Sequence, residues 1–184
     1  MSKLNYLKIE KTSVANGVGV RVVLWVSGCT CHCKCCQNPQ SWDFNSGSLF
    51  DENAKKELFE SLNKPYIQGI TFSGGHPLEP ENVDEIFSLI HEIKERFPKK
   101  DIWLYTGYTW ESIMKPVVTD DLNLERDIWL DKRREIVLNC DIVVDGSYID
   151  ELKDITLKWR GSSNQRVIDV KKTLTENKIV LYNN

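Results

Sequence analysis

The sequence RVVLWVSGCTCHCKCCQNP, residues 21–39, joins an apolar run to a loop that is crowded with cysteine. The run at residues 21–27 is short, rich in β-branched residues and closed by Gly28, which is typical of a buried strand. Five of the six cysteines of the chain follow within eight consecutive positions. The stretch therefore predicts a strand whose carboxyl end carries a loop for metal or redox chemistry.

Segments with strand-like and helix-like periodicity alternate on both sides of this stretch. We expect a β-hairpin around residues 6–20, further strands at 68–73, 101–106 and 140–145, and helices at 51–62, 83–97, 109–115 and 125–136. Strands separated by helices run parallel, because each return to the sheet crosses a helix. A complete eightfold barrel needs about 250 residues. The 184 residues therefore favour an α/β fold with a partial (open) β/α barrel, a mostly parallel sheet and an N-terminal hairpin.

The composition is that of one globular domain, which we expect to span residues 1–184. Apolar residues make up 41% and charged residues 28% of the chain, and the formal net charge is -3. This balance argues against a general nucleic-acid binder, whose surface is usually basic. The sequence has neither an apolar secretory segment near Met1 nor a run of about 20 apolar residues that would span a bilayer. We expect a cytoplasmic protein with no membrane partner.

The spacing of the cysteines allows more than one metal site. Cys29, Cys33 and Cys36 form a C-x3-C-x2-C pattern, and three thiolates on one loop can hold three irons of a [4Fe-4S] cluster while the fourth iron stays open. Cys31 and Cys35 add two thiols to the same loop, so a four-thiolate zinc site remains an alternative, although adjacent ligands crowd a tetrahedral ion. A thiol–disulfide role is less favoured, because neighbouring cysteines form strained bridges. Cys140 lies in an apolar strand and is expected in the core.

Polar and glycine-rich segments stand where each predicted strand ends. In α/β sheets and barrels, the chemistry lies at the carboxyl ends of the strands. Here those ends carry the cysteine loop and residues 73–77, 105–107 and 145–147. We expect these four segments to meet at one cavity.

The C-x3-C-x2-C loop and the stretch SGGHPL at residues 73–78 resemble the radical S-adenosylmethionine superfamily. The resemblance implies a partial barrel of the radical SAM type and a [4Fe-4S] cluster on Cys29, Cys33 and Cys36. It also implies S-adenosyl-L-methionine as a cofactor at the open iron, with its amino group received by the glycine-rich stretch. Glycine suits that position because the backbone can approach a ligand without a Cβ.

Further stretches narrow the resemblance. Residues 23–28, 38–39, 41–44, 102–108 and 157–169 are similar to the activating enzymes of the anaerobic (class III) ribonucleoside-triphosphate reductase. That family uses a reduced cluster to split S-adenosylmethionine, and the 5'-deoxyadenosyl radical so formed makes a glycyl radical on the reductase. The implied partners are the reductase large subunit and an electron donor such as flavodoxin or ferredoxin, with no nucleic acid. Another radical SAM enzyme, such as a different glycyl-radical activase or a nucleobase-modifying enzyme, and a zinc-binding interaction module remain alternatives.

The resemblance implies a set of cofactor contacts and no general acid or base, so we nominate no catalytic residue. An aromatic residue at a strand end, such as Tyr105, more often belongs to the core, and Asp145 is equally expected in a plain turn before glycine. The expected cofactor contacts are Cys35, Cys36, Gln37, Ser73, Gly74, Gly75, His76, Tyr105, Thr106 and Asp145.

The chain departs from the family pattern at two places. The histidine that usually stands two positions after the first cluster cysteine is shifted by one, so Cys31 comes there and His32 follows. His76 replaces the acidic residue that usually follows the paired glycines, and a neutral imidazole cannot supply the charge of a carboxylate. Residues 159–165, WRGSSNQ, are expected as a polar loop that either docks the reductase or caps the sheet.

Overall fold

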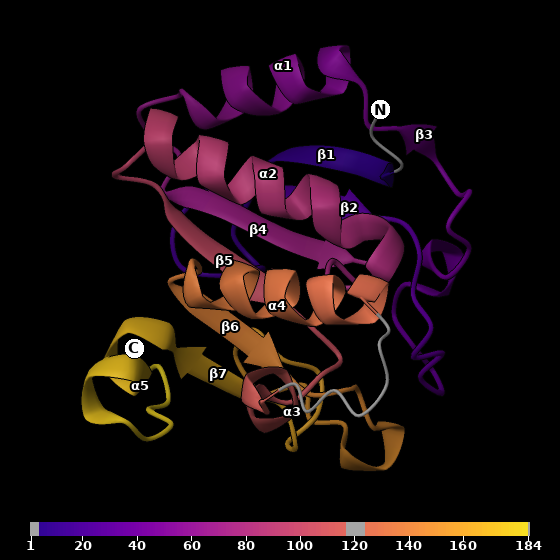
Figure 1. Cartoon of the computed structure of the whole chain (residues 1–184), viewed down its shortest axis with the longest axis vertical. Coiled ribbons are helices and arrows are strands. Elements are labelled where there is room, and N and C mark those ends of the chain that lie inside the picture. Colours follow the sequence, from indigo (N-terminus) through magenta and orange to yellow (C-terminus); the bar gives the residue numbers. More distant parts are fainter. Residues whose placement is uncertain (1–3, 117–123, 184) are drawn as a thin grey trace.

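The computed structural model describes residues 4–116 and 124–183 and is built on a seven-stranded sheet (Figure 1). The strand order is β3-β1-β2-β4-β5-β6-β7, in which the central four, β2, β4, β5 and β6, are parallel to one another. The outer strands pair antiparallel with their neighbours. The strands are β1 (Asn5–Ser13), β2 (Arg21–Val26), β3 (Ser48–Leu49), β4 (Gly69–Gly74), β5 (Asp101–Tyr105), β6 (Ile142–Asp145) and β7 (Arg166–Asp169). The predicted α/β class is confirmed.

The described residues form five α-helices, and none of them is long and apolar enough to cross a membrane. Two predicted N-caps are confirmed, because Asp51 accepts a hydrogen bond from the Ala54 amide (2.9 Å) and Thr109 accepts one from the Ser112 amide (3.3 Å). The helices are α1 (Glu52–Leu62), α2 (Pro80–Arg96), α3 (Trp110–Met114), α4 (Leu124–Leu138) and α5 (Val170–Glu176).

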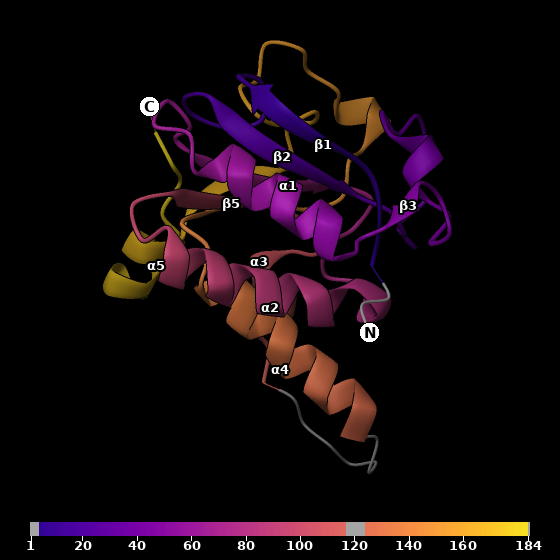
Figure 2. The same ribbon diagram turned by 90° about the horizontal axis from the view of Figure 1, so that it is seen from above.

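Helices α1, α2 and α4 cover one face of the sheet (Figures 1 and 2). The predicted apolar stripe of α2 is confirmed, since Val83, Ile86, Ile90 and Ile93 are buried against the sheet. Cys140 is also buried in this core, and its burial raises the pKa of the thiol. The opposite face carries a smaller aromatic cluster, which includes Trp103, Val144, Val167, Trp159 and Tyr182. Both faces of the central strands are therefore covered, which explains their continuous apolar runs.

The predicted N-terminal hairpin is present, but its two strands are β1 and β2 rather than two strands within residues 6–20. Residues 6–20 do not pair among themselves; instead β1 lies antiparallel to β2, and residues 14–20 form the connecting bends. Gly17 and Gly19 have positive φ angles of 140° and 72° in this connection, which explains why no second strand forms there. The sequence analysis also missed β3, β7 and α5, and α2 begins at Pro80 rather than near Val83. The predicted domain bounds 1–184 include residues 1–3, 117–123 and 184, which lie outside the described residues.

Candidate active site

The cysteine loop leaves the carboxyl end of β2 and is tied back to the segment that follows it. The amides of Gly28 and Cys29 donate to the carbonyls of Ser41 (2.8 Å) and Trp42 (3.1 Å), and the Cys36 amide donates to the Cys33 carbonyl (3.1 Å). His32 and Cys35 adopt left-handed φ angles of 41° and 55°, which are uncommon outside glycine. The sequence thus folds into a compact, internally hydrogen-bonded loop with closely spaced thiols.

A cavity of about 200 Å³ lies where β2, β4, β5 and β6 end. As predicted, the segments that follow these four strands meet there. The cavity is lined by Cys29, Cys33, Cys36, Gln37, Ser73, Gly74, Gly75, His76, Tyr105 and Thr106 of the expected set, and by Asn16, Trp25, Cys31, Asn38, Gly107, Gly146, Ser147, Tyr148, Gly161 and Gln165 in addition. Among the described residues that line it there is no Lys or Arg.

Gly75 holds the ends of β2 and β4 against each other. Its amide donates to the Val26 carbonyl (2.7 Å), and a Cβ at this position would lie 2.5 Å from the carbonyl oxygen of Gly28. The next amide, that of His76, donates to the same Gly28 carbonyl (2.7 Å). Glycine is thus needed for the close approach of two backbones, as well as for the open cavity wall that the sequence predicted.

All six cysteines are described and none forms a disulfide. A hydrogen bond between the thiols of Cys29 and Cys31 raises the pKa of Cys29 and lowers that of Cys31. Burial raises the pKa of the Cys33 thiol. The Cys36 sulfur accepts a hydrogen bond from the Asn38 amide at 3.4 Å. Four cysteines of the loop, all but Cys35, line the cavity.

The separation of these sulfurs bears on which metal group fits. A tetrahedral zinc ion with Zn–S bonds of about 2.3 Å places its sulfur ligands about 3.8 Å apart. Among the described His, Cys, Asp and Glu residues, the only three ligand atoms that lie within 4.8 Å of one another come from Cys29, Cys31 and Glu79. Cys29, Cys33 and Cys36 are not drawn together to that degree. Their placement around one cavity suits a multi-iron cluster, in which each thiolate binds a different iron.

Glu79 is a buried acid that the sequence analysis missed. It is 2% exposed and lies between β4 and α2, where its carboxylate contacts Thr30 of the cysteine loop and His76. Burial tends to raise the pKa of this carboxyl, but hydrogen bonds from His76 and Thr30 outweigh it and hold the pKa below its ordinary value. In the sequence, an acid before Pro80 resembles an ordinary helix-start residue, so only the return of the cysteine loop reveals its burial.

Two expected cofactor contacts do not line the cavity. Cys35 is exposed, and its thiol forms a hydrogen bond with Asp150 that raises the pKa of the thiol. Asp145 is 1% exposed, and its two oxygens accept hydrogen bonds from Arg166 Nε (3.0 Å) and from the amide of Trp110 (2.7 Å). In this structure Asp145 therefore fixes β7 and α3 against β6 and presents no free oxygen to a ribose.

The polar loop at residues 159–165 closes the cavity beside β6. Gln165 accepts a hydrogen bond from the Gly161 amide (2.9 Å) and donates one to the Gly146 carbonyl (2.9 Å). The Tyr105 hydroxyl donates to the Trp159 carbonyl (2.8 Å), and burial raises the pKa of this phenol. Tyr105 thus serves both the cavity wall and the aromatic cluster, and the loop caps the sheet.

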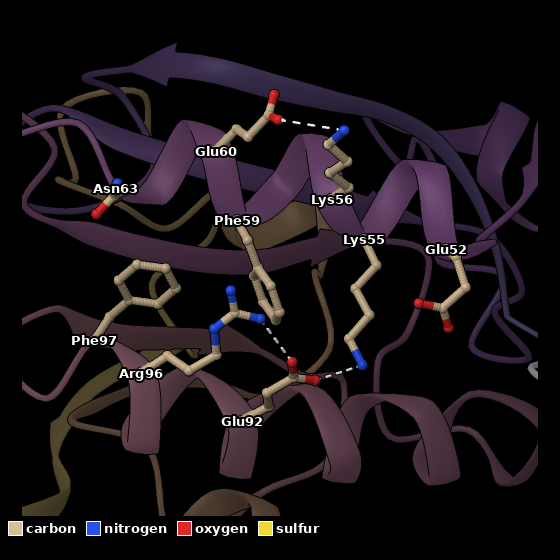
Figure 3. Close-up of a pocket in the computed structure, with 9 residues that line it drawn as sticks. All are labelled: Glu52, Lys55, Lys56, Phe59, Glu60, Asn63, Glu92, Arg96 and Phe97. Atoms are coloured by element: carbon tan, nitrogen blue, oxygen red, sulfur yellow. Dashed lines mark hydrogen bonds and ion pairs between the residues drawn. The ribbon is translucent and has the colours of Figure 1, made fainter.

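A larger hollow of about 670 Å³ lies between α1 and α2 (Figure 3). Lys55 and Arg96 both pair there with Glu92, and the Arg96 guanidinium lies 4.4 Å from the ring centre of Phe59. The hollow contains no cysteine or histidine, and its central charges are already paired. We therefore place the chemistry at the cysteine cavity.

Comparison with known proteins supports this choice. A family model described as a 4Fe-4S single cluster domain matches residues 15–168. The anaerobic ribonucleoside-triphosphate reductase-activating protein of Enterobacteria phage T4 is 42% identical over 164 residues, which are 89% of this chain and 93% of that protein. The chain belongs to the family of anaerobic ribonucleoside-triphosphate reductase-activating proteins. Proteins of the same name from Haemophilus influenzae and Escherichia coli K12 are each 38% identical, over 88% and 89% of this chain and 96% and 97% of their own lengths.

Membership of the reductase-activating family places the cysteine loop inside a single-cluster domain. The matched region includes all five loop cysteines and the four strand ends that surround the cavity. The chain covers nearly the full length of these relatives, so the cavity lies in the part that the reductase-activating proteins share with it. The residues at the cavity are the candidates for holding the cluster.

Proposed function

We propose that this protein is a radical S-adenosylmethionine activase that forms the glycyl radical on an anaerobic ribonucleoside-triphosphate reductase. One observation carries the proposal. Three thiols with C-x3-C-x2-C spacing share a cavity with the glycine pair of β4, in a chain 42% identical to a named reductase-activating protein. Residues 1–184 would act as one domain, a partial barrel of the radical SAM type, in the cytoplasm.

In this proposal Cys29, Cys33 and Cys36 hold the [4Fe-4S] cluster. When bound, the reduced cluster and S-adenosylmethionine supply one electron and a carbon radical that removes a hydrogen atom from a glycine of the partner. The chain binds and orients the cofactor, and Gly74 and Gly75 leave room for close approach to the backbone. The other contacts come from Gln37, Ser73, His76, Tyr105 and Thr106, which line the same cavity.

The protein substrate is the large subunit of the reductase, and an external donor such as flavodoxin or ferredoxin reduces the cluster. A cavity at the carboxyl edge of an open sheet suits a macromolecular substrate, because a loop of the partner has room to enter. The charge of the cavity wall limits which groups can make polar contacts with a bound molecule. No Lys or Arg lines it among the described residues, so its polar contacts come from neutral side chains, thiols and the backbone.

The test is a spin measurement on the partner. The anaerobically reconstituted, reduced protein is mixed with S-adenosylmethionine and a class III reductase, and the glycyl radical is followed by electron paramagnetic resonance. We expect a glycyl-radical doublet with the reductase and none with a formate-lyase type glycyl-radical enzyme. A doublet with the lyase alone would assign the protein to another activase, and cleavage of the cofactor with neither partner would point to a different radical enzyme.

A further inference from the structure

Glu79 is a buried titratable group for which the proposed function has no use. One of its oxygens, Oε1, accepts three hydrogen bonds: from the Thr30 amide (2.9 Å), from the Thr30 hydroxyl (2.7 Å) and from His76 Nδ1 (3.0 Å). Three donors on one carboxyl oxygen stabilise the ionised form of Glu79. A negative charge thus lies under the cysteine loop, at a residue that is 2% exposed.

The orientation of His76 follows from its other neighbours. The Gly107 amide, which can only donate, points at His76 Nε2 at 3.3 Å, and the Thr106 hydroxyl lies 2.8 Å from the same nitrogen. Nε2 is therefore the acceptor, and Nδ1 carries the proton that is donated to Glu79. The ring thus links the Glu79 carboxylate to Thr106 and to the Gly107 amide.

The chain of contacts ties together three strand ends. Thr30 belongs to the loop after β2, His76 follows β4, and Thr106 follows β5. Glu79 and His76 are both nearly inaccessible to water, at 2% and 1% exposure. These contacts hold the cysteine loop at a fixed place relative to the rest of the cavity wall.

The carboxylate also lies close to the sulfur of Cys29. A Glu79 oxygen is within 4.8 Å of the Cys29 sulfur, which we assign as a cluster ligand. In a buried site with a low effective dielectric, a negative charge at this distance opposes the arrival of an electron. The reduction potential of an iron–sulfur cluster depends on the net charge and the hydrogen bonds around it.

We propose that Glu79 is a positioning residue that fixes the cysteine loop, and that its negative charge lowers the reduction potential of the cluster. The electron added to the cluster comes from an external reductant, and no bond forms or breaks in this step. The inference rests on the proposed function only for the presence of the cluster. A cluster at a lower potential is a stronger reductant, which is what cleavage of a sulfonium requires.

The test is a redox titration of the anaerobically reconstituted protein with dithionite, without S-adenosylmethionine or the reductase. Three variants are compared with the wild type after iron per chain has been measured. Glu79→Gln removes the charge and keeps the shape, so we expect its midpoint potential to shift to a more positive value. Glu79→Asp keeps the charge and is expected to stay closer to the wild type. Glu81→Gln removes an exposed charge two residues away and is the matched control, with no shift expected.

A fourth variant is expected to shift the midpoint potential in the opposite direction. Thr30→Val removes the hydroxyl that donates to Glu79, so the carboxylate charge is less neutralised and the potential is expected to become more negative. If Glu79→Gln loses its iron, the midpoint potential of Thr30→Val still tests the effect of the Glu79 charge. Equal potentials for Glu79→Gln and the wild type, equal positive shifts for Glu79→Gln and Glu79→Asp, or a positive shift for Thr30→Val would overturn the proposal. Failure of the wild type to cleave S-adenosylmethionine would overturn the proposed function and leave this result standing.

Discussion

The two ends of the central parallel strands both bury charged side chains, and they use them differently. At the amino ends, Arg21 is fully buried and donates to Thr71 Oγ1 (2.9 Å), to the Val18 carbonyl (2.9 Å) and to the Ile70 carbonyl (2.8 Å). It also pairs with Asp101. Each nitrogen of the guanidinium thus has a partner inside the fold, and the side chain of Arg21 has no exposed surface.

At the carboxyl ends, the buried polar groups surround a cavity. Glu79 and His76 are as buried as Arg21, but their contacts run to the cysteine loop and to residues that line the cavity. Burial alone therefore does not mark a functional group. At the amino ends the hydrogen bonds of the buried charge run to groups inside the fold. At the carboxyl ends they run to residues that line the cavity.

The largest effect is expected at the carboxyl ends, when single loop cysteines are replaced by alanine. We expect Cys29→Ala, Cys33→Ala and Cys36→Ala to lose most of the bound iron, because each removes one cluster ligand. Cys31→Ala and Cys35→Ala serve as matched controls within the same loop and are expected to keep near-normal iron. Iron and sulfide per chain after anaerobic reconstitution measure the effect, and equal losses at all five positions would contradict the ligand assignment.

At the other end, Arg21→Met should destabilise the fold by about 3 kcal/mol, because it removes several buried hydrogen bonds and leaves Asp101 without its ion-pair partner. The free energy of unfolding in denaturant, measured on the metal-free protein, reports the change. Lys11→Met is the control, since Lys11 pairs with Glu57 on the surface and should change stability by less than about 1 kcal/mol. A loss at Arg21 no larger than at Lys11 would mean that the amino end is not a stabilising site.

The smallest effect is expected at the ion pair between Glu111 and Arg166. Glu111 pairs with Arg166, which lowers the pKa of Glu111 to about 2 from its ordinary 4.5. A depressed carboxyl pKa stabilises the fold above about pH 4.5, and this contribution is lost as the pH falls toward 2. Because the side chain is 60% exposed, we expect Glu111→Gln to cost less than about 1 kcal/mol at pH 7. The difference in the free energy of unfolding between Glu111→Gln and the wild type should shrink in acid, which unfolding at several pH values measures. Glu95→Gln, at an exposed position, serves as control. A difference that grows in acid would refute the pairing.

The central strands and the first two helices could be predicted from the sequence for physical reasons. Apolar β-branched runs such as that of β2 require burial on both faces, and Asp51 caps α1 through a contact three residues away. The edge elements lack such signals. Strand β3 has two exposed residues, and β7 is defined by its antiparallel pairing with β6. These pairings depend on distant partners rather than on local pattern.

In the candidate site too, features with a local sequence signal could be predicted, and features that depend on distant partners could not. The meeting of four strand ends at one cavity followed from the parallel topology, and the expected thiols and glycines line it. Asp145 could not be placed, because the partner that occupies its oxygens, Arg166, lies on a strand that the sequence did not predict. Glu79 was missed because its main contact, Thr30, lies 49 residues away in the chain.

We propose that three cysteines hold a cluster with one iron open to S-adenosylmethionine. The most direct measurement is the electron paramagnetic resonance spectrum of the reduced, reconstituted protein before and after the cofactor is added. We predict a [4Fe-4S] signal that changes on addition of S-adenosylmethionine, because the cofactor binds the open iron. A protein that holds no iron, or a cluster signal that S-adenosylmethionine leaves unaltered, would contradict the account.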